Sequence, residues 1–231
     1  AVAPPGSTVA TEATNYHGIL RAAALLKLKL VGLECDRDGM RPQAFERLCR
    51  DKPPAALICT PTIHNPTSAT MPIERRRALM ALANRHDVPV IEDDICGQLA
   101  IGQHVPLSAL GLKSWCYVGG TSKRILPGLR VGYVAAPREL IAPLIDAVRS
   151  MSWVTAGLMS EIATRWIIDG TADRMIAWHR RETAARQAIV RRLLGHLDYA
   201  ANPASYHIWL KLPDRKSARL NSSHVSESRM P

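Results

Sequence analysis

The chain has 231 residues, of which 47% are apolar, 22% charged and 5% aromatic, with a formal net charge of +10 at pH 7. This composition is typical of a globular protein and excludes a disordered, collagen-like or coiled-coil chain. No apolar run approaches the roughly 18 residues of a membrane-spanning helix. The opening residues lack both an initiator Met and the pattern of a secretion signal, so we expect an N-terminally truncated chain.

The positive charge raises the question of nucleic-acid binding. The densest basic groups, such as Arg75–Arg77, lie in segments with helical spacing, where we expect them on a solvated helix face. A phosphate-binding patch is the alternative, but the aromatic residues that would stack on bases do not interleave with the basic ones. The five cysteines are dispersed without CxxC spacing, which favours a reducing, cytoplasmic setting over a disulfide framework or a zinc site.

The first 140 residues alternate short apolar runs with segments of helical periodicity. Apolar runs bounded by turn residues predict strands, and apolar residues three or four apart predict helices. Such alternation predicts βαβ units and a largely parallel sheet. The predicted strands are 7–12, 29–34, 55–60, 88–92, 114–118 and 131–135, the predicted helices are 19–27, 42–50 and 74–86, and a turn is predicted at 36–39.

Beyond Pro137 the pattern becomes helical, with helices predicted at 140–150, 157–168 and 171–196 and a strand at 205–212. We therefore predict a large α/β domain over 1–140 and the start of a smaller, truncated C-terminal domain over 141–213. Residues 214–231 lack periodicity and resemble the translation of a common sequencing-library adapter. They are predicted to be a non-native tail, with a genuine polar tail as the alternative.

Polar segments follow several of the predicted strands. Asn65 follows the strand at 55–60, Asp93 ends the strand at 88–92, and Lys123 follows the strand at 114–118. Residues just past the carboxyl ends of parallel strands line a ligand crevice, so these side chains are expected to converge. Each segment alone is a weak signal, because a single lysine is most often a surface residue and Gly-Gly-Thr-Ser-Lys lacks the order of a P-loop.

Taken together in chain order, these segments resemble the class I/II aminotransferases. These enzymes use pyridoxal 5′-phosphate (PLP) and have the fold called type I among PLP enzymes. The greatest similarity is to the aminotransferase-like domain of MocR-type regulators in the GntR group, and it covers about residues 1–213. It implies an α/β fold with a mainly parallel sheet flanked by helices, a PLP-binding large domain and the start of a smaller α+β domain. The resemblance is carried by Asn-Pro-Thr at 65–67, Ile-Glu-Asp-Asp-Ile at 91–95, Ser-Lys at 122–123 and Leu-Pro-Gly-Leu-Arg-Val-Gly-Tyr at 126–133.

The resemblance implies a role for each polar residue. Lys123 would form the Schiff base with PLP and then shuttle a proton. Asp93 would pair with the pyridinium nitrogen, so that the ring accepts electrons. Asn65 would donate to the phenolate oxygen, and the guanidinium of Arg130 would bind the phosphate.

Further positions support or depart from the family pattern. Tyr16 would stack on the cofactor and Ser122 would contact the phosphate; the alternatives are an ordinary buried tyrosine and a turn hydroxyl. Cys96 stands where the family has a tyrosine, and Gly120 where a phosphate-binding serine is usual. Because a thiol is a weak donor, Cys96 is expected to loosen the cofactor, and the two departures together are expected to make transamination less efficient.

The resemblance implies an aminotransferase that moves an amino group between an amino acid and a 2-oxo acid, and a homodimer. The alternative is the effector domain of a MocR-type regulator that binds PLP and an amino compound with little turnover. DNA would then be contacted only through an N-terminal domain outside this sequence. A cofactor-free α/β domain is a third reading. No residue here matches the family's substrate-carboxylate arginine, which is expected beyond Pro213.

Overall fold

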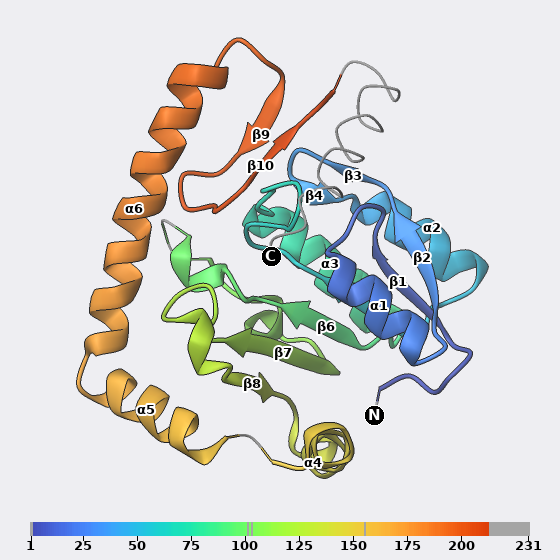
Figure 1. The fold of residues 1–231 in the computed structure, drawn as a ribbon. Coiled ribbons are helices and arrows are strands. Elements are labelled where there is room, and N and C mark those ends of the chain that lie inside the picture. The colour runs from blue at the N-terminus through green and yellow to red at the C-terminus, as the bar shows by residue number, and fades with distance from the viewer. Residues whose placement is uncertain (1, 101, 103, 155, 213–231) are drawn as a thin grey trace, which may run out of the picture.

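The computed structural model describes residues 2–100, 102, 104–154 and 156–212, which form a central sheet with helices on both faces (Figure 1). The sheet has six strands in the order β2-β1-β5-β6-β7-β8. All neighbouring pairs are parallel except β7 and β8, so the predicted mainly parallel sheet is confirmed. Its strands are β1 (Thr8–Glu12), β2 (Lys29–Leu33), β5 (Ala56–Cys59), β6 (Val90–Asp93), β7 (Trp115–Gly120) and β8 (Gly132–Ala135).

The helices follow the predicted order. Their bounds are α1 (His17–Leu25), α2 (Pro42–Asp51), α3 (Ile73–Arg85), α4 (Arg138–Ser152), α5 (Gly157–Ile168) and α6 (Thr171–Leu194), with 3₁₀ helices η1 (Gly97–Leu99), η2 (Leu107–Leu110) and η3 (Pro127–Leu129). Two small hairpins pair β3 (Cys35–Asp36) with β4 (Gly39–Met40) and β9 (Tyr199–Ala201) with β10 (Ile208–Leu210). Among the described residues no helix is long and apolar enough to cross a membrane.

The two faces of the sheet bury different side chains. Helices α2 and α3 cover one face, where Phe45, Leu79 and Val90 belong to the largest core cluster. The opposite face borders an apolar groove between α1 and α4. Because side chains alternate along a strand, Glu92 follows Val90 to the core face, whereas Asp93 lines the groove. The sheet therefore places these adjacent carboxyl groups in separate environments.

The C-terminal part differs from the sequence prediction. The strand predicted at 205–212 is only the three residues of β10, and β9 was not predicted. The loop before β10 satisfies its polar groups locally, because Asn202 Oδ1 accepts the Ala204 N–H at 2.9 Å and Ser205 Oγ donates to the His207 carbonyl at 2.9 Å. These bonds compete with strand pairing and shorten the strand. The tail predicted at 214–231 lies outside the described residues.

The expectation that Arg75–Arg77 form a solvated helix face is wrong for the middle residue. Arg76 is 1% exposed, and its guanidinium donates to the carbonyls of Met71, Pro61 and Val105 and to Thr62 Oγ1 at 2.8–3.2 Å. Successive helical residues point about 100° apart, so three in a row cannot share one face. Arg77 is exposed, as predicted, and Arg75 pairs with Asp36.

A close packing occurs where β7 meets β8. Gly119 lies opposite Tyr133, and a Cβ at position 119 would be 2.4 Å from Tyr133 Cζ. The Tyr133 ring stacks on Tyr117 with centroids 6.5 Å apart, and the Arg124 guanidinium lies 5.1 Å from its centroid. The tyrosine ring therefore fills the space of a side chain at position 119 and is held there from two directions.

Candidate active site

Three predicted site residues lie at the carboxyl ends of neighbouring strands. Asp93 ends β6, while Asn65 and Lys123 lie on the segments that follow β5 and β7, the strands on either side of it. The pKa of the Cys96 thiol is raised to about 11, mainly by burial, and the charge of Asp93 raises it whereas that of Lys123 lowers it. Both charges thus act on one thiol, as expected of groups that converge at this edge of the sheet.

Four polar side chains at this edge have no partner among the described residues. Asn65, Lys123 and Arg130 are exposed, and the side chains of all three and of Ser122 make no hydrogen bond or ion pair with a described residue. Arg130 has left-handed backbone torsions after η3, with φ of 52°. A guanidinium, an amine, an amide and a hydroxyl are therefore available to a ligand.

Asp93 is a partly buried carboxyl group next to an apolar surface. It lines the groove of about 380 Å³ between α1 and α4, whose other lining residues are uncharged. Its Oδ1 accepts the Ile95 N–H at 3.2 Å, and no described cation pairs with it. Burial raises the pKa of Asp93, with the Ile95 N–H opposing the shift and Asp94 adding to it. Such a carboxylate gains stability from a ligand that brings a positive charge.

Tyr16 precedes α1 at the carboxyl end of β1. Its backbone N–H donates to Asn15 Oδ1 at 2.7 Å, and a Cβ at Gly18 would lie 2.2 Å from Tyr16 Cε1. The ring thus folds over a residue that has no side chain. It is 41% exposed, so the alternative of an ordinary buried tyrosine is wrong.

The C-terminal hairpin loop contacts two of the segments that carry predicted site residues. Tyr206 donates its hydroxyl to the Lys123 carbonyl at 2.6 Å, and His207 Nε2 lies 3.2 Å from the carbonyl oxygen of His64. Burial lowers the pKa of His64 to about 4, so its ring is neutral at pH 7. Sequence reasoning missed these residues because no local pattern reports contacts between segments so far apart in the chain.

Glu12 was also missed, although the rule that found Asp93 applies to it, since it ends β1. It is 2% exposed, and its pKa is raised to about 7, chiefly by burial, with a smaller contribution from the charge of Asp93. Hydrogen bonds from the Thr60 N–H and the Thr11 hydroxyl oppose this shift. A carboxyl group that titrates near neutral pH thus lies beside the site.

This carboxyl group predicts a pH dependence of stability that Glu12→Gln removes. The folded pKa of about 7 exceeds the ordinary value of 4.5, so the folded chain binds more protons between these values and its stability falls as pH rises. The loss amounts to about 3 kcal/mol. Urea unfolding at pH 5 and pH 8 checks this: the free energy of unfolding of Glu12→Gln, relative to wild type, rises across the interval. If the difference in the free energy of unfolding between Glu12→Gln and wild type is the same at pH 5 and pH 8, the raised pKa of Glu12 is contradicted.

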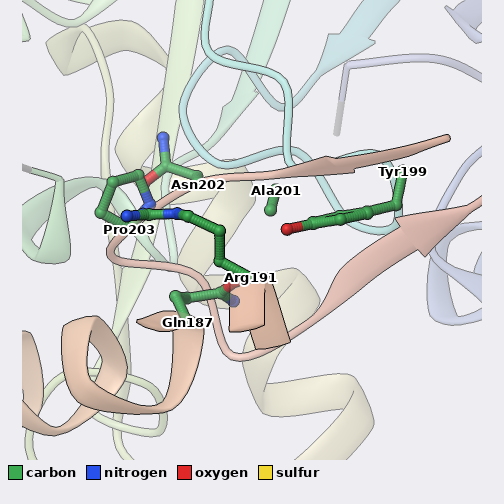
Figure 2. A pocket seen from close by; sticks show the side chains of 6 residues that line it. All are labelled: Gln187, Arg191, Tyr199, Ala201, Asn202 and Pro203. Carbon is green, nitrogen blue, oxygen red and sulfur yellow. The ribbon is translucent and has the colours of Figure 1, made fainter. Parts of the chain in front are cut away.

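A second hollow, of about 260 Å³, lies between the C-terminal part of α6 and the β9–β10 hairpin (Figure 2). Its Gln187 amide is already engaged, donating to the Ser205 carbonyl at 2.8 Å. None of the residues predicted for the site lines it; the lining residues are Gln187, Arg191, Tyr199, Ala201, Asn202 and Pro203. Among the described residues no group of histidine, cysteine and acidic side chains could hold a metal ion. We therefore place the candidate active site at the sheet edge.

The sequence matches the family described as aminotransferase class I and II over residues 1–219. The chain belongs to this family. The match covers all the strands of the central sheet and each candidate site residue.

Curated relatives include both regulators and enzymes. The HTH-type transcriptional regulator YdcR of Escherichia coli (strain K12) is 30% identical over 230 residues, covering 93% of this chain and 47% of the regulator. The 2-aminoadipate transaminase of Thermus thermophilus is 25% identical, covering 92% of this chain and 56% of that enzyme. The chain thus spans about half the length of the curated relatives that it matches.

Solved structures of aminotransferases share the fold. LysN, an alpha-aminoadipate aminotransferase from Thermus thermophilus complexed with N-(5′-phosphopyridoxyl)-L-leucine, has a TM-score of 0.83 at 25% identity, with 93% of this chain and 58% of LysN covered. The kynurenine aminotransferase of Pyrococcus horikoshii has a TM-score of 0.84 at 23% identity, covering 96% and 58%. The predicted fold type I is therefore confirmed.

In this aminotransferase-family chain, the surroundings of Gly120 leave little room for a side chain. A Cβ on Gly120 would lie 3.3 Å from both Ile95 Cδ1 and the Val131 carbonyl oxygen, tighter than ordinary contact. The Gly120 carbonyl accepts the Arg124 Nε–H at 2.8 Å, which fixes the backbone here. A larger residue at 120 therefore requires its neighbours to shift by a few tenths of an ångström.

Proposed function

We propose that the chain is the cofactor-binding part of a PLP-dependent aminotransferase that transfers an amino group between an amino acid and a 2-oxo acid. The observation that carries the proposal is the position of Asn65, Asp93 and Lys123 at the ends of adjacent parallel strands, in a chain of this family. Among the described residues, the Asn65 and Lys123 side chains have no hydrogen-bond partner and Asp93 has no cationic partner. The phosphopyridoxyl compound bound to LysN supports PLP as the cofactor.

The donor set fits the functional groups of PLP. Asp93, a carboxylate without a cationic partner among the described residues, suits a protonated pyridine nitrogen. The exposed amine of Lys123 suits the aldehyde, the guanidinium of Arg130 the phosphate, and the amide of Asn65 the phenolate oxygen. We further assign Tyr16 to stacking on the ring.

The remaining assignments complete the proposal. Ser122 is assigned to the phosphate, next to Lys123. We propose that residues 1–140 form the PLP-binding domain, that 141–213 begin a smaller domain, and that the whole protein is a cytoplasmic homodimer. Its substrates would be an amino acid and a 2-oxo acid.

In the proposed chemistry, the cofactor accepts electrons, and residues of the chain bind the cofactor and transfer protons. PLP, when bound, supplies an electron sink for the pair left on the amino acid Cα when its proton departs. Lys123 Nζ would hold the cofactor covalently, and as a free amine it would take up the Cα proton of the substrate and give it back. Asp93 keeps the proton on the ring nitrogen, and Asn65 and Arg130 hold the cofactor in place.

The direct test is to add PLP to the chain and then a panel of amino acids. We expect a visible absorbance band from bound PLP that decays with at least one amino acid, together with release of the matching 2-oxo acid. Absence of the band would overturn cofactor binding. A band that persists with every amino acid would overturn the aminotransferase and leave PLP binding intact.

A regulatory role is the second candidate, because YdcR, 30% identical over nearly the whole chain, is an HTH-type transcriptional regulator. In that case the site would bind PLP and an amino compound as an effector, without turnover. DNA would be contacted through a separate N-terminal domain. The same titration distinguishes the candidates, since an effector changes the absorbance band without producing a 2-oxo acid.

Cys96→Tyr is expected to tighten PLP binding several-fold. The thiol is a weak donor, and its raised pKa keeps it protonated, whereas a phenol at this position would add a hydrogen bond of about 1 kcal/mol to the cofactor. Fluorescence titration of apo-protein with PLP measures the change, with Cys116→Ser on the same sheet as a control. Unchanged affinity in Cys96→Tyr would contradict the placement of residue 96 next to the cofactor.

A further inference from the structure

A single buried carboxylate joins the ends of two neighbouring strands. Glu12 Oε1 accepts the Thr60 N–H at 2.8 Å. Its Oε2 accepts Asn15 Nδ2 at 3.0 Å and the Thr11 hydroxyl at 3.2 Å. The side chain is 2% exposed, so these hydrogen bonds are shielded from water. The carboxylate thus accepts hydrogen bonds from two segments that are far apart in the sequence.

The hydrogen bonds of Glu12 connect β1 and β5 beyond the last backbone pairing of these two strands. The pairing of β1 with β5 runs through Val9 with Ala56 and Ala10 with Leu57 and stops there. Glu12, the last residue of β1, and Thr60, which follows the last residue of β5, both lie beyond this ladder. The Glu12 side chain therefore supplies the cross-strand bond where the backbone no longer does.

Each segment held by Glu12 leads to a residue assigned to the cofactor. Asn15, which donates to Glu12, accepts the Tyr16 N–H through its Oδ1 at 2.7 Å. Thr60 begins the segment that continues to Asn65. One carboxylate thus fixes the start of the Asn65 loop and, through the Asn15 amide, the backbone of Tyr16.

We propose that Glu12 is a positioning residue of the cofactor site, which holds the Tyr16 and Asn65 segments at a fixed separation. Its effect on PLP rests on the proposed function, whereas the coupling of the two segments is a property of the chain alone. Glutamine cannot take over this role, because its amide has one acceptor oxygen and places an NH₂ group against one of the facing N–H donors.

Hydrogen exchange of the apo-protein, followed by mass spectrometry, tests the coupling without cofactor. In Glu12→Gln, peptides over 13–18 and 60–66 are both expected to exchange at least tenfold faster. Of the hydrogen bonds to Glu12, Asn15→Ala removes only the one from residue 15, so only the 13–18 peptide is expected to exchange faster. The matched control is Glu92→Gln, a glutamate 1% exposed that accepts the N–H groups of Leu107 and Ser108 and is expected to loosen 105–112 instead.

PLP affinity tests the consequence for the site. Binding is measured at pH 8, above the Glu12 pKa of about 7, where this group is mostly ionised. Loss of one hydrogen bond to a charged group then predicts binding about tenfold weaker in Glu12→Gln, and several-fold weaker in Asn15→Ala, which keeps the buried carboxylate. The exposed Glu34→Gln should bind as wild type does. Unchanged exchange at both segments in Glu12→Gln would overturn the coupling. If Glu12→Gln does not fold, Asn15→Ala decides the question. Unchanged exchange at 13–18 together with unchanged PLP affinity in Asn15→Ala would then overturn the coupling.

Different results would overturn the proposed function and the positioning role of Glu12. If wild type binds no PLP, the proposed function is overturned while the exchange data still decide the coupling. If wild type binds PLP and both variants bind it equally well, the positioning role of Glu12 is overturned and the proposed function remains.

Discussion

Lys123→Ala will abolish covalent attachment of PLP to the chain. Wild type incubated with PLP and reduced with borohydride should carry one phosphopyridoxyl group on the peptide that contains Lys123. The side chain is exposed and makes no hydrogen bond or ion pair with a described residue, so its amine is available to the aldehyde. In the variant we expect loss of this label and of any amino-group transfer, with the fold unchanged.

Lys113→Ala is the matched control for this experiment. Lys113 is another exposed lysine, but its Nζ is engaged by the Asn84 carbonyl at 3.3 Å and by Asp87 Oδ1 at 3.4 Å. The control should keep the label on Lys123. A label of equal intensity elsewhere in Lys123→Ala would contradict the assignment and indicate non-specific reaction of surface amines.

Arg76→Ala is expected to destabilise the protein by roughly 3–5 kcal/mol. The substitution leaves the carbonyls of Met71 and Val105 without their Arg76 donor, and the Pro61 carbonyl keeps only the Met71 N–H. The shorter side chain opens a cavity beneath α3. It also removes a positive charge that lowers the pKa of Glu92 and Asp94. Urea unfolding at pH 7 measures the loss.

Arg77→Ala controls for the removal of an arginine from the same helix. Arg77 is exposed, so its substitution should change the free energy of unfolding by no more than about 0.5 kcal/mol. A similar loss in both variants would show that net charge rather than burial determines the effect, and would contradict the role given to Arg76.

The sequence predicted the elements whose periodicity is local. The strands around Ala56 and Val90 are short apolar runs, and α5 has the predicted bounds. The antiparallel direction of β8 was not predictable, because Gly132–Ala135 has the same pattern in either direction. The three residues of β9 carry no alternation that would mark a strand.

For the site, sequence reasoning predicted residues that directly follow strands and missed those that act through distant contacts. Asp93 and Lys123 were predicted because the carboxyl ends of parallel strands share one edge. Tyr206 reaches the Lys123 backbone from a residue 83 positions away, a contact that only the folded chain reveals. Arg76 was misjudged because charge alone does not tell a solvated helix face from a buried guanidinium that satisfies carbonyls.

The packing of Gly119 against Tyr133 limits how this part of the chain can evolve. A side chain at 119 would meet the Tyr133 ring, which Tyr117 and Arg124 contact, so the ring must move or become smaller for the substitution to fit. Shortening Tyr133 alone uncovers the Gly119 backbone, because the ring no longer fills this space. The two positions are thus expected to vary together in an alignment.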